Sequence, residues 1–397
     1  MLRVALKMLV GDRAKYVGLI FGITFTSFLV TFAASYFAGI MTRGYALVSE
    51  NATADVWVMD PAVNSVEQTT NMSLQALARV RSVAGVQSAV PLMLATADVR
   101  FPNGRYQPFQ IIGVDDVTLT GLPPMKGGVM PGLLRVPDAV VVDAGGSSGK
   151  LETPFQVADQ WPRDKPHLDA PTRELATGDE LLVNDYLVRV AGRSQGLPRF
   201  PPRPQLYMTV SNATRILPPE RRRLTFVLAT AAPGVAPEDL AIRIESATGL
   251  RARTSADFKS DTVHWFLVNS EDVGDIAAML TLAMSVGFGV TGVMLYMFTN
   301  ENLRNYAVLT AMGATPRLLL TMVFAQAGVC GLIGTGLGLG LSAIIGQLAI
   351  MAGFPFRMMW FTPLLGAVTV VLVSVVAAAL SVRPVLKLEP SLVFSGR

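Results

Sequence analysis

The chain has 397 residues, of which 51% are hydrophobic and only 16% are charged. About a quarter of the residues are charged in an ordinary soluble domain, so this composition argues against a wholly soluble protein. The formal net charge is +4, but residues 43–275 hold nearly all the acidic residues, and the basic excess lies in the parts that flank the longest apolar runs. The basic excess is therefore no argument for nucleic acid binding.

Residues 1–15 place Leu2, Leu6 and Leu9 on one helical face, with Arg3 and Lys7 off that face. This pattern predicts a cytoplasmic amphipathic segment that lies at the membrane interface. The apolar run that follows is longer than the 7–15 residues of a signal peptide core, so we predict an uncleaved anchor.

Four segments contain no Asp, Glu, Lys or Arg, and each exceeds the ~20 residues that a helix needs to cross the hydrocarbon core. They are Tyr16–Thr42, Ile276–Asn300, Leu318–Phe356 and Met358–Val382. A buried helix of a soluble protein can be equally apolar but is rarely as long. We therefore predict a membrane α-helical fold with spans at residues 16–42, 276–300, 318–352 and 360–382, and a large extracytoplasmic α+β domain at residues 43–275.

The predicted domain contains two similar β-α-β patterns, at about residues 50–100 and 222–260. In the first, Ser73 is the expected N-cap of the helix and Gly85 its expected end. We predict two β-α-β lobes around a β-rich insert, in which the Pro- and Arg-rich join between residues 194 and 205 is an exposed loop. The single cysteine, Cys330, lies in a predicted span, so we expect no disulfide in the domain.

Residues 301–317 separate two uncharged runs and predict a short helix that ends sharply. Gly313 suits the residue after the helix, Thr315 suits the cap of the next helix, and Pro316 suits its first turn. The second half of this short helix is mostly apolar. An apolar helix too short to span must be covered by lipid headgroups or by a partner protein, and the residues alone favour neither.

The third span carries glycines at helical spacing, namely Gly334, Gly336, Gly338 and Gly340. Pairs at i and i+4 let helices approach closely in lipid, so we predict that these four glycines are helix-packing positions. A short external loop, residues 353–359, precedes the fourth span, and residues 383–397 form the tail.

Lys and Arg cluster before the first span, in the 301–317 loop and after the fourth span. An excess of these cations marks the cytoplasmic side of a membrane. We therefore expect both termini and the 301–317 loop to be cytoplasmic.

No motif in the chain predicts catalysis or metal binding. Residues 144–151 resemble a phosphate loop but lack its first glycine and its Ser/Thr. Residues 145–149 fit G-x-S-x-G, but neither His167 nor His264 has the context of a catalytic base. We expect no catalytic, cofactor or metal site in this chain.

The loop sequence resembles the MacB/FtsX-type permeases of ABC exporters, whose loop commonly reads R-E-I-G-I-L-R-A-L-G-A-S. Matching positions are Arg304, Leu309, Ala311, Gly313 and Ala314, with Val308, Met312 and Thr315 as close replacements. Asn305, Ala307 and Thr310 depart from that pattern, and Tyr306-Ala307 followed by VLTAMG is closer to the DevC-type branch. The N-terminal Ala5, Leu6 and Leu9 and the C-terminal Pro384 and Pro390 also resemble the family, whereas Gln326 stands where many relatives have Glu.

The resemblance implies a permease subunit of an ABC exporter that acts as a homodimer. ATP and Mg would bind a separate ATPase chain, and the permease would transmit ATP-driven motion to its external domain by mechanotransmission. It also implies a location in the bacterial inner membrane, with a periplasmic adaptor and an outer-membrane channel as partners. The implied ATPase-coupling residues are Arg304, Tyr306, Val308, Leu309, Met312 and Gly313.

A second function is an FtsX-like transmembrane regulator, whose external domain controls a cell-envelope hydrolase without moving a substrate. The β-rich insert favours export, because a larger domain offers an adaptor more surface. An independent membrane enzyme is disfavoured because a catalytic constellation is missing from the sequence.

Overall fold

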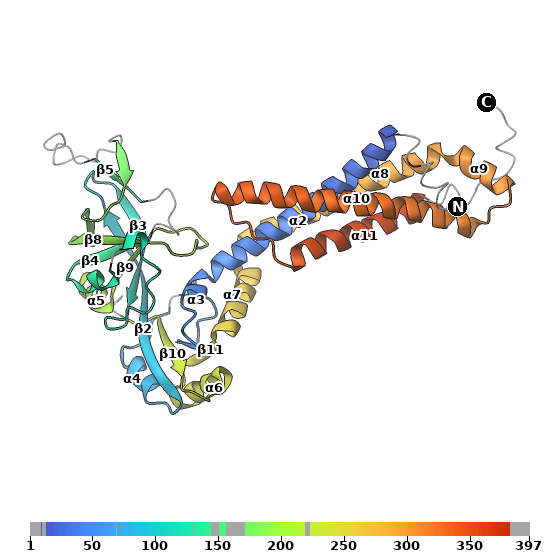
Figure 1. Cartoon of the computed structure of the whole chain (residues 1–397). Helices are drawn as coiled ribbons and strands as arrows, with labels where there is room; N and C mark the ends of the chain where they lie inside the picture. The colour runs from blue at the N-terminus through green and yellow to red at the C-terminus, as the bar shows by residue number, and fades with distance from the viewer. Residues whose placement is uncertain are drawn as a thin grey trace. The chain divides into compact units, whose positions relative to one another are not determined.

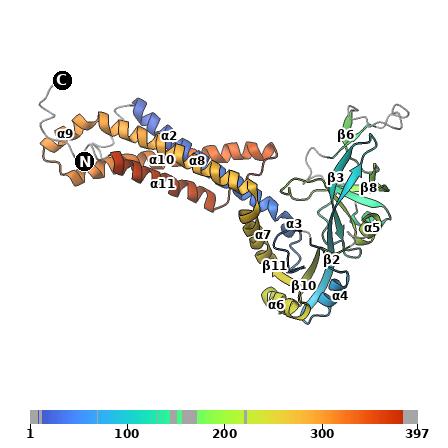
Figure 2. The ribbon, with the colours of Figure 1, turned by 180° about the vertical axis from the view of Figure 1, so that it is seen from behind.

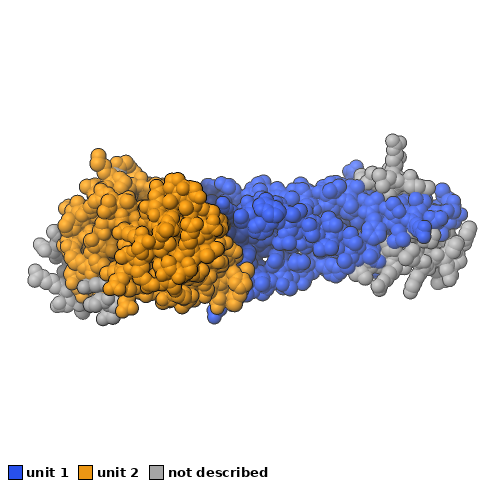
Figure 3. Space-filling view, turned by 90° about the horizontal axis from the view of Figure 1, so that it is seen from below, with its two compact units in different colours: residues 1–40, 270–397 blue, residues 41–269 orange. Residues whose placement is uncertain are grey.

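The computed structural model describes residues 9, 13–68, 70–128, 130–143, 151–155, 171–218 and 223–381. The predictions made for most of residues 1–15, for residues 144–150, for His167 and for the tail at 383–397 therefore lie outside the described residues. The chain divides into two compact units (Figure 3). One contains Met1–Ile40 and Ser270–Arg397, and the other contains Met41–Asn269.

The first unit is helical. Its helices are α2 (Arg13–Gly44), α8 (Glu271–Glu301), α9 (Leu303–Ala311), α10 (Pro316–Met351) and α11 (Phe361–Ser381). All except α9 are long and apolar enough to cross a membrane, over Tyr16–Gly44, Glu271–Glu301, Arg317–Met351 and Phe361–Ala379. Helix α11 packs against both α8 and α10 (Figure 1).

The second unit contains one nine-stranded sheet in the order β11-β1-β10-β2-β3-β9-β4-β8-β7. Its strands are β1 (Val56–Met59), β2 (Val86–Arg100), β3 (Tyr106–Val114), β4 (Ala139–Asp143), β7 (Glu180–Val183), β8 (Tyr186–Ser194), β9 (Gln205–Thr209), β10 (Phe226–Ala231) and β11 (Arg251–Thr254). A separate hairpin pairs β5 (Glu152–Pro154) with β6 (Thr172–Glu174).

The two β-α-β patterns interleave in one layer instead of forming two lobes. Strand β10 pairs with both β1 and β2, and β1 pairs with both β10 and β11, always antiparallel. Each pattern leaves a gap between its own two strands, and a strand of the other pattern fills that gap. The sequence patterns could not reveal this, because the pairing joins strands more than 130 residues apart. The connecting helices α4 (Gln75–Arg81) and α6 (Pro237–Thr248) supply Val80, Leu240 and Ile244 to one core with Val58 and Val227.

The β-rich insert, together with β2 of the first β-α-β pattern, closes into a six-stranded barrel. Besides its neighbours in the sheet order, β2 also pairs with β7, through Val99 with Val183 and Arg100 with Leu182. The ring therefore runs β2-β3-β9-β4-β8-β7 and back to β2. Figure 2 shows β2, β3 and β8 of this ring from behind. Its apolar interior includes Phe109, Val142 and Val188. A closed ring leaves few free strand edges to pair with other chains.

Shorter elements complete the second unit. They are α3 (Ala46–Glu50), α5 (Val210–Ile216), α7 (Ser255–Asn269) and the 3-10 helices η1 (Lys126–Gly128) and η2 (Pro131–Arg135). Helix α4 begins at Gln75 with Leu74 as its N-cap, so Ser73 is not the cap, although its hydroxyl accepts a hydrogen bond from the Gln75 amide at 3.2 Å. Helix α4 ends at Arg81, before Gly85, whereas α6 is followed by Gly249 in the left-handed conformation.

The join between β8 and β9 was predicted to be an exposed loop, and this prediction was wrong for its central residues. Arg199 is 7% exposed and Gly196 is also buried, although Leu197 and Pro198 are exposed. Sequence composition predicts exposure because Arg and Pro usually lie at the surface. Here a buried carboxylate, Glu50, accepts a hydrogen bond from the arginine.

Candidate functional site

Helix α9 lies between α8 and α10 and is held at both ends by backbone hydrogen bonds. At its start, the Tyr306 amide donates to the Asn302 carbonyl at 3.1 Å. At its end, the Gly313 amide donates to the Thr310 carbonyl and the Ala314 amide to the Leu309 carbonyl, both at 2.9 Å. These two bonds form a Schellman motif, which requires a left-handed residue after the helix. Gly313 supplies it with a φ of 93°, so the abrupt end of α9 depends on a glycine at this position.

One face of α9 is packed into the helical unit. Tyr306 and Ala307 are buried, and Leu303 and Leu309 are partly buried against a core that includes Leu319, Met322 and Val323. The Tyr306 hydroxyl donates a 2.9 Å hydrogen bond to Gln326 Oε1 on α10. Burial raises the pKa of Tyr306 to about 12, so the hydroxyl stays protonated and remains a donor at neutral pH. The buried face therefore fixes α9 to α10 by packing and by a directional bond.

The opposite face of α9 is open. Val308 is 41% exposed and Met312 is 74% exposed, and Asn305 is exposed one turn earlier. Their spacing of i, i+3 and i+7 places them in one stripe along the helix. Arg304 lies within α9, but its side chain is outside what the structure describes. Val308, in α9, and Met312, its C-cap, are therefore large exposed apolar side chains that a partner surface can cover.

Two residues assigned to ATPase coupling are positioned differently from Val308 and Met312. Tyr306 is fully buried, and Leu309 packs partly inward, so neither presents its whole side chain to a partner. Periodicity alone could not separate the two faces, because a nine-residue helix that is apolar on both sides has no clear polar stripe. The buried polar partner Gln326, twenty residues further along the chain, distinguishes the inward face.

The four glycines of α10 lie on two different faces. A Cβ placed on Gly334 would lie 2.6 Å from Ile23 Cγ2, and a Cβ on Gly338 would lie 2.6 Å from the Thr24 carbonyl oxygen. Both contacts are with α2. Around Gly336 and Gly340, by contrast, no described atom lies within 4 Å of an added Cβ. Gly334 and Gly338 thus permit close approach of two helices within this chain, and the packing role of Gly336 and Gly340 stays a prediction.

Another close glycine contact was not anticipated from the sequence. A Cβ on Gly366 of α11 would lie 2.0 Å from Thr31 Oγ1 of α2. Along α2, Thr24, Ser27, Thr31 and Ser35 recur every three or four residues. This hydroxyl stripe facing small residues was the signal in the sequence that could have identified α2 as a packing partner.

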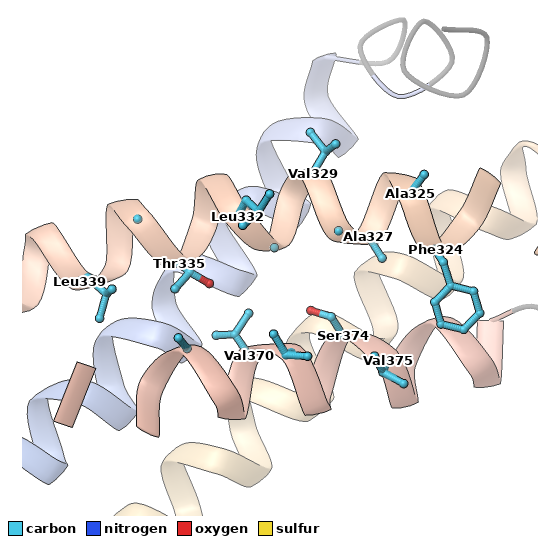
Figure 4. Close-up of a pocket in the computed structure, with 15 residues that line it drawn as sticks. Phe324, Ala325, Ala327, Val329, Leu332, Thr335, Leu339, Val370, Ser374 and Val375 are labelled. Atoms are coloured by element: carbon cyan, nitrogen blue, oxygen red, sulfur yellow. The ribbon is translucent and has the colours of Figure 1, made fainter. Parts of the chain in front are cut away.

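An apolar groove of about 650 Å³ lies between α10 and α11 (Figure 4). Its walls include Phe324, Leu332 and Val371, and its only hydroxyls are those of Thr335 and Ser374. Gly336 lines this groove. The lining has no titratable group, so it offers no acid, base or nucleophile stronger than a hydroxyl.

Among the residues that the structure describes, no group of three or more His, Cys, Asp or Glu side chains could hold a metal ion. His264 lies on α7, and the G-x-S-x-G segment is outside the described part of the chain. The expectation of no catalytic or cofactor site stays a prediction.

Comparison with solved structures gives a number of similar domains, including the following three. The periplasmic region of MacB from Actinobacillus actinomycetemcomitans is 14% identical, with a TM-score of 0.35 over 53% of this chain and 92% of that one. The extracellular domain of the noncanonical ABC-type transporter YknZ from Gram-positive bacteria is 10% identical, with a TM-score of 0.31 over 51% and 98%. A domain of a protein described as a permease from Porphyromonas gingivalis is 12% identical, with a TM-score of 0.31 over 52% and 90%.

Comparison with curated proteins gives no match. The family model of the FtsX-like permease C-terminal domain matches residues 277–390. The matched region contains most of α8 and all of α9, α10 and α11. It therefore includes the whole candidate site, from the exposed stripe of α9 to the glycines of α10. Residues 277–390 are therefore similar to the C-terminal domain of FtsX-like permeases.

Proposed function

We propose that the chain is the permease subunit of an ABC exporter, and that α9 is the helix through which a separate ATPase drives it. The observation that carries the proposal is the two-sided construction of α9 inside the region that matches the FtsX-like family. One side is fixed to α10 by Tyr306 and its bond to Gln326, and the other presents Val308 and Met312. A force applied to the exposed side would therefore be carried into a long helix.

The same proposal places the four apolar helices in a bacterial inner membrane, with both termini and α9 on the cytoplasmic side. Two features support this placement: the length and composition of the helices, and the excess of Lys and Arg in the segments assigned to the cytoplasm. The second unit would then be periplasmic, where a homodimer could engage an adaptor and an outer-membrane channel.

Mechanotransmission is the mode of action that the helical packing supports best. The spans predicted from the sequence, at residues 16–42, 276–300, 318–352 and 360–382, contain no Asp, Glu, Lys or Arg. Helix α2 lies close against α10 at Gly334 and Gly338. Such an interior lacks the ionisable groups that mark ion or proton pathways. The long helices would move as rigid bodies and carry motion from α9 to the second unit, and a substrate need not pass between them. A regulator that controls an envelope hydrolase would use the same motion of the helices. The function of the periplasmic partner therefore distinguishes an exporter from a regulator.

The test is co-purification of an ABC ATPase with the full-length permease and with Met312→Asp. If Met312 fills a groove on the ATPase, a carboxylate there should weaken binding by about 2–3 kcal/mol, roughly 30- to 150-fold, because a charge would be buried without a partner. Met312 is 74% exposed, so the variant should fold and reach the membrane normally.

A matched control is Val117→Asp, which introduces the same charge at a 77% exposed apolar residue of the second unit. This control should retain the ATPase. Equal retention of the ATPase by wild type, Met312→Asp and Val117→Asp would contradict the assignment of α9 as the coupling helix. Transport activity, measured alongside binding, separates an exporter from a regulator.

A further inference from the structure

The join between β8 and β9, residues 195–203, is here termed the strap; its Gly196 and Arg199 are buried. Its Leu197 amide donates to Glu50 Oε1 at the end of α3, and its Phe200 amide donates to the Arg43 carbonyl at 3.3 Å. The Phe200 ring lies 6.2 Å from the Phe266 ring on α7. Arg43 lies in the last turn of α2, and α7 directly precedes α8 in sequence. The strap thus contacts the residues that adjoin two of the apolar helices.

Arg199 joins these contacts to the barrel. Its Nη2 donates to Glu50 Oε2 at 2.7 Å and to the Tyr207 hydroxyl at 2.9 Å. Its Nη1 donates to Gln110 Oε1 at 3.5 Å. Tyr207 lies on β9 and Gln110 on β3, which are adjacent barrel strands. One guanidinium therefore connects the end of α3 to two strands of the barrel.

The ion pair between Arg199 and Glu50 is almost completely buried, with side chains 8% and 7% exposed. Removing two charges from water is costly, and an apolar pair of similar volume is often at least as stable. Stability alone is therefore a poor account of this pair. What an apolar pair cannot reproduce is the planar fork of arginine, which binds several acceptors in fixed directions.

We infer that Arg199 is a positioning residue that transmits movement of the apolar helices to the barrel. The inference rests on the proposed mechanotransmission. When the Arg43–Glu50 segment or α7 is displaced, the strap moves with it because of these contacts. Arg199 then transmits this movement to β3 and β9 through its bonds to Gln110 and Tyr207. Without the guanidinium of Arg199, the Arg43–Glu50 segment and the barrel move independently, although each remains folded.

The experiment is amide hydrogen exchange on the full-length permease bound to its co-purifying ATPase, with and without ATP. Arg199→Lys keeps the charge but cannot contact Glu50, Tyr207 and Gln110 together. Exchange at the Leu197 and Phe200 amides should rise at least tenfold in this variant. The ATP-dependent change at β3 and β9, present in wild type, should disappear, while ATPase binding stays unchanged.

Two further variants sharpen the test. The double variant Glu50→Leu/Arg199→Met removes the charges together and should melt close to wild type, yet also lack the ATP-dependent change in the barrel. Arg215→Lys alters an ion pair with Asp138 in which both side chains are 46% exposed, and it should behave as wild type.

The inference is overturned if the strap amides of Arg199→Lys exchange at the wild-type rate. It is also overturned if either the Lys variant or the double variant keeps the wild-type response of β3 and β9 to ATP. If wild type itself shows no response to ATP, the proposed mechanotransmission fails, and the inference fails with it.

Discussion

Gly338 and Gly340 of α10 should respond in opposite directions to the same substitution. An added Cβ at Gly338 would lie 2.5 Å from Ser27 Cβ and 2.6 Å from the Thr24 carbonyl oxygen. Ordinary carbon contacts are ~3.5–4.0 Å, and one of these obstacles is backbone, so α2 and α10 must separate by about 1 Å. Overpacking of this kind costs about 1–3 kcal/mol.

At Gly340 no described atom lies within 4 Å of the added Cβ. The alanine there meets no obstacle and restricts the backbone of the unfolded chain. Gly→Ala in a helix is then favourable by about 0.5–1 kcal/mol. The predicted difference between Gly338→Ala and Gly340→Ala is therefore about 1.5–4 kcal/mol, although the two substitutions are chemically identical and lie in the same helix.

The assay is thermal or denaturant unfolding of the full-length permease in one detergent, with wild type, Gly338→Ala and Gly340→Ala side by side. The pair Gly334→Ala and Gly336→Ala provides a second comparison with the same expected signs. Destabilisation by Gly340→Ala as large as that by Gly338→Ala would refute the reasoning, because it would mean that both faces of α10 are packed. Equal stability of all three proteins would mean that α2 does not approach α10 at Gly338.

Two further predictions concern buried polar groups. Tyr306→Phe removes the hydrogen bond to Gln326 Oε1 and should lower the free energy of unfolding by about 1–2 kcal/mol. The same unfolding assay measures this change, and an unchanged free energy of unfolding would mean that the bond makes no net contribution to stability. Burial raises the pKa of the Glu67 carboxyl above its ordinary value, against the opposing attraction of Arg203. Because the folded state then binds the proton more tightly than the unfolded state, this carboxyl should make the protein less stable as the pH rises from about 4 through its folded pKa. The difference in unfolding free energy between wild type and Glu67→Gln should therefore fall over that range, and a difference that rises with pH would contradict the direction of the shift.

Local patterns in the sequence were sufficient to locate several elements. Long runs without charge mark the apolar helices, because a charged side chain in hydrocarbon is expensive. Gly313 marks the end of α9, because the Schellman motif needs a left-handed residue. Both signals lie within a few turns of chain, so they can be recognised without knowing the rest of the fold.

Tertiary structure alone decided which faces and strands meet. Gly338 packs against α2 and Gly340 does not, although the two glycines are equivalent in sequence pattern. Tyr306 points inward, where Gln326 Oε1 accepts a hydrogen bond from its hydroxyl. The barrel closes because Val99 pairs with Val183, and Arg199 is buried because Glu50 lies beside it. In each case the deciding partner is distant in sequence, and the contact depends on how separate segments pack, which neither hydropathy nor periodicity encodes.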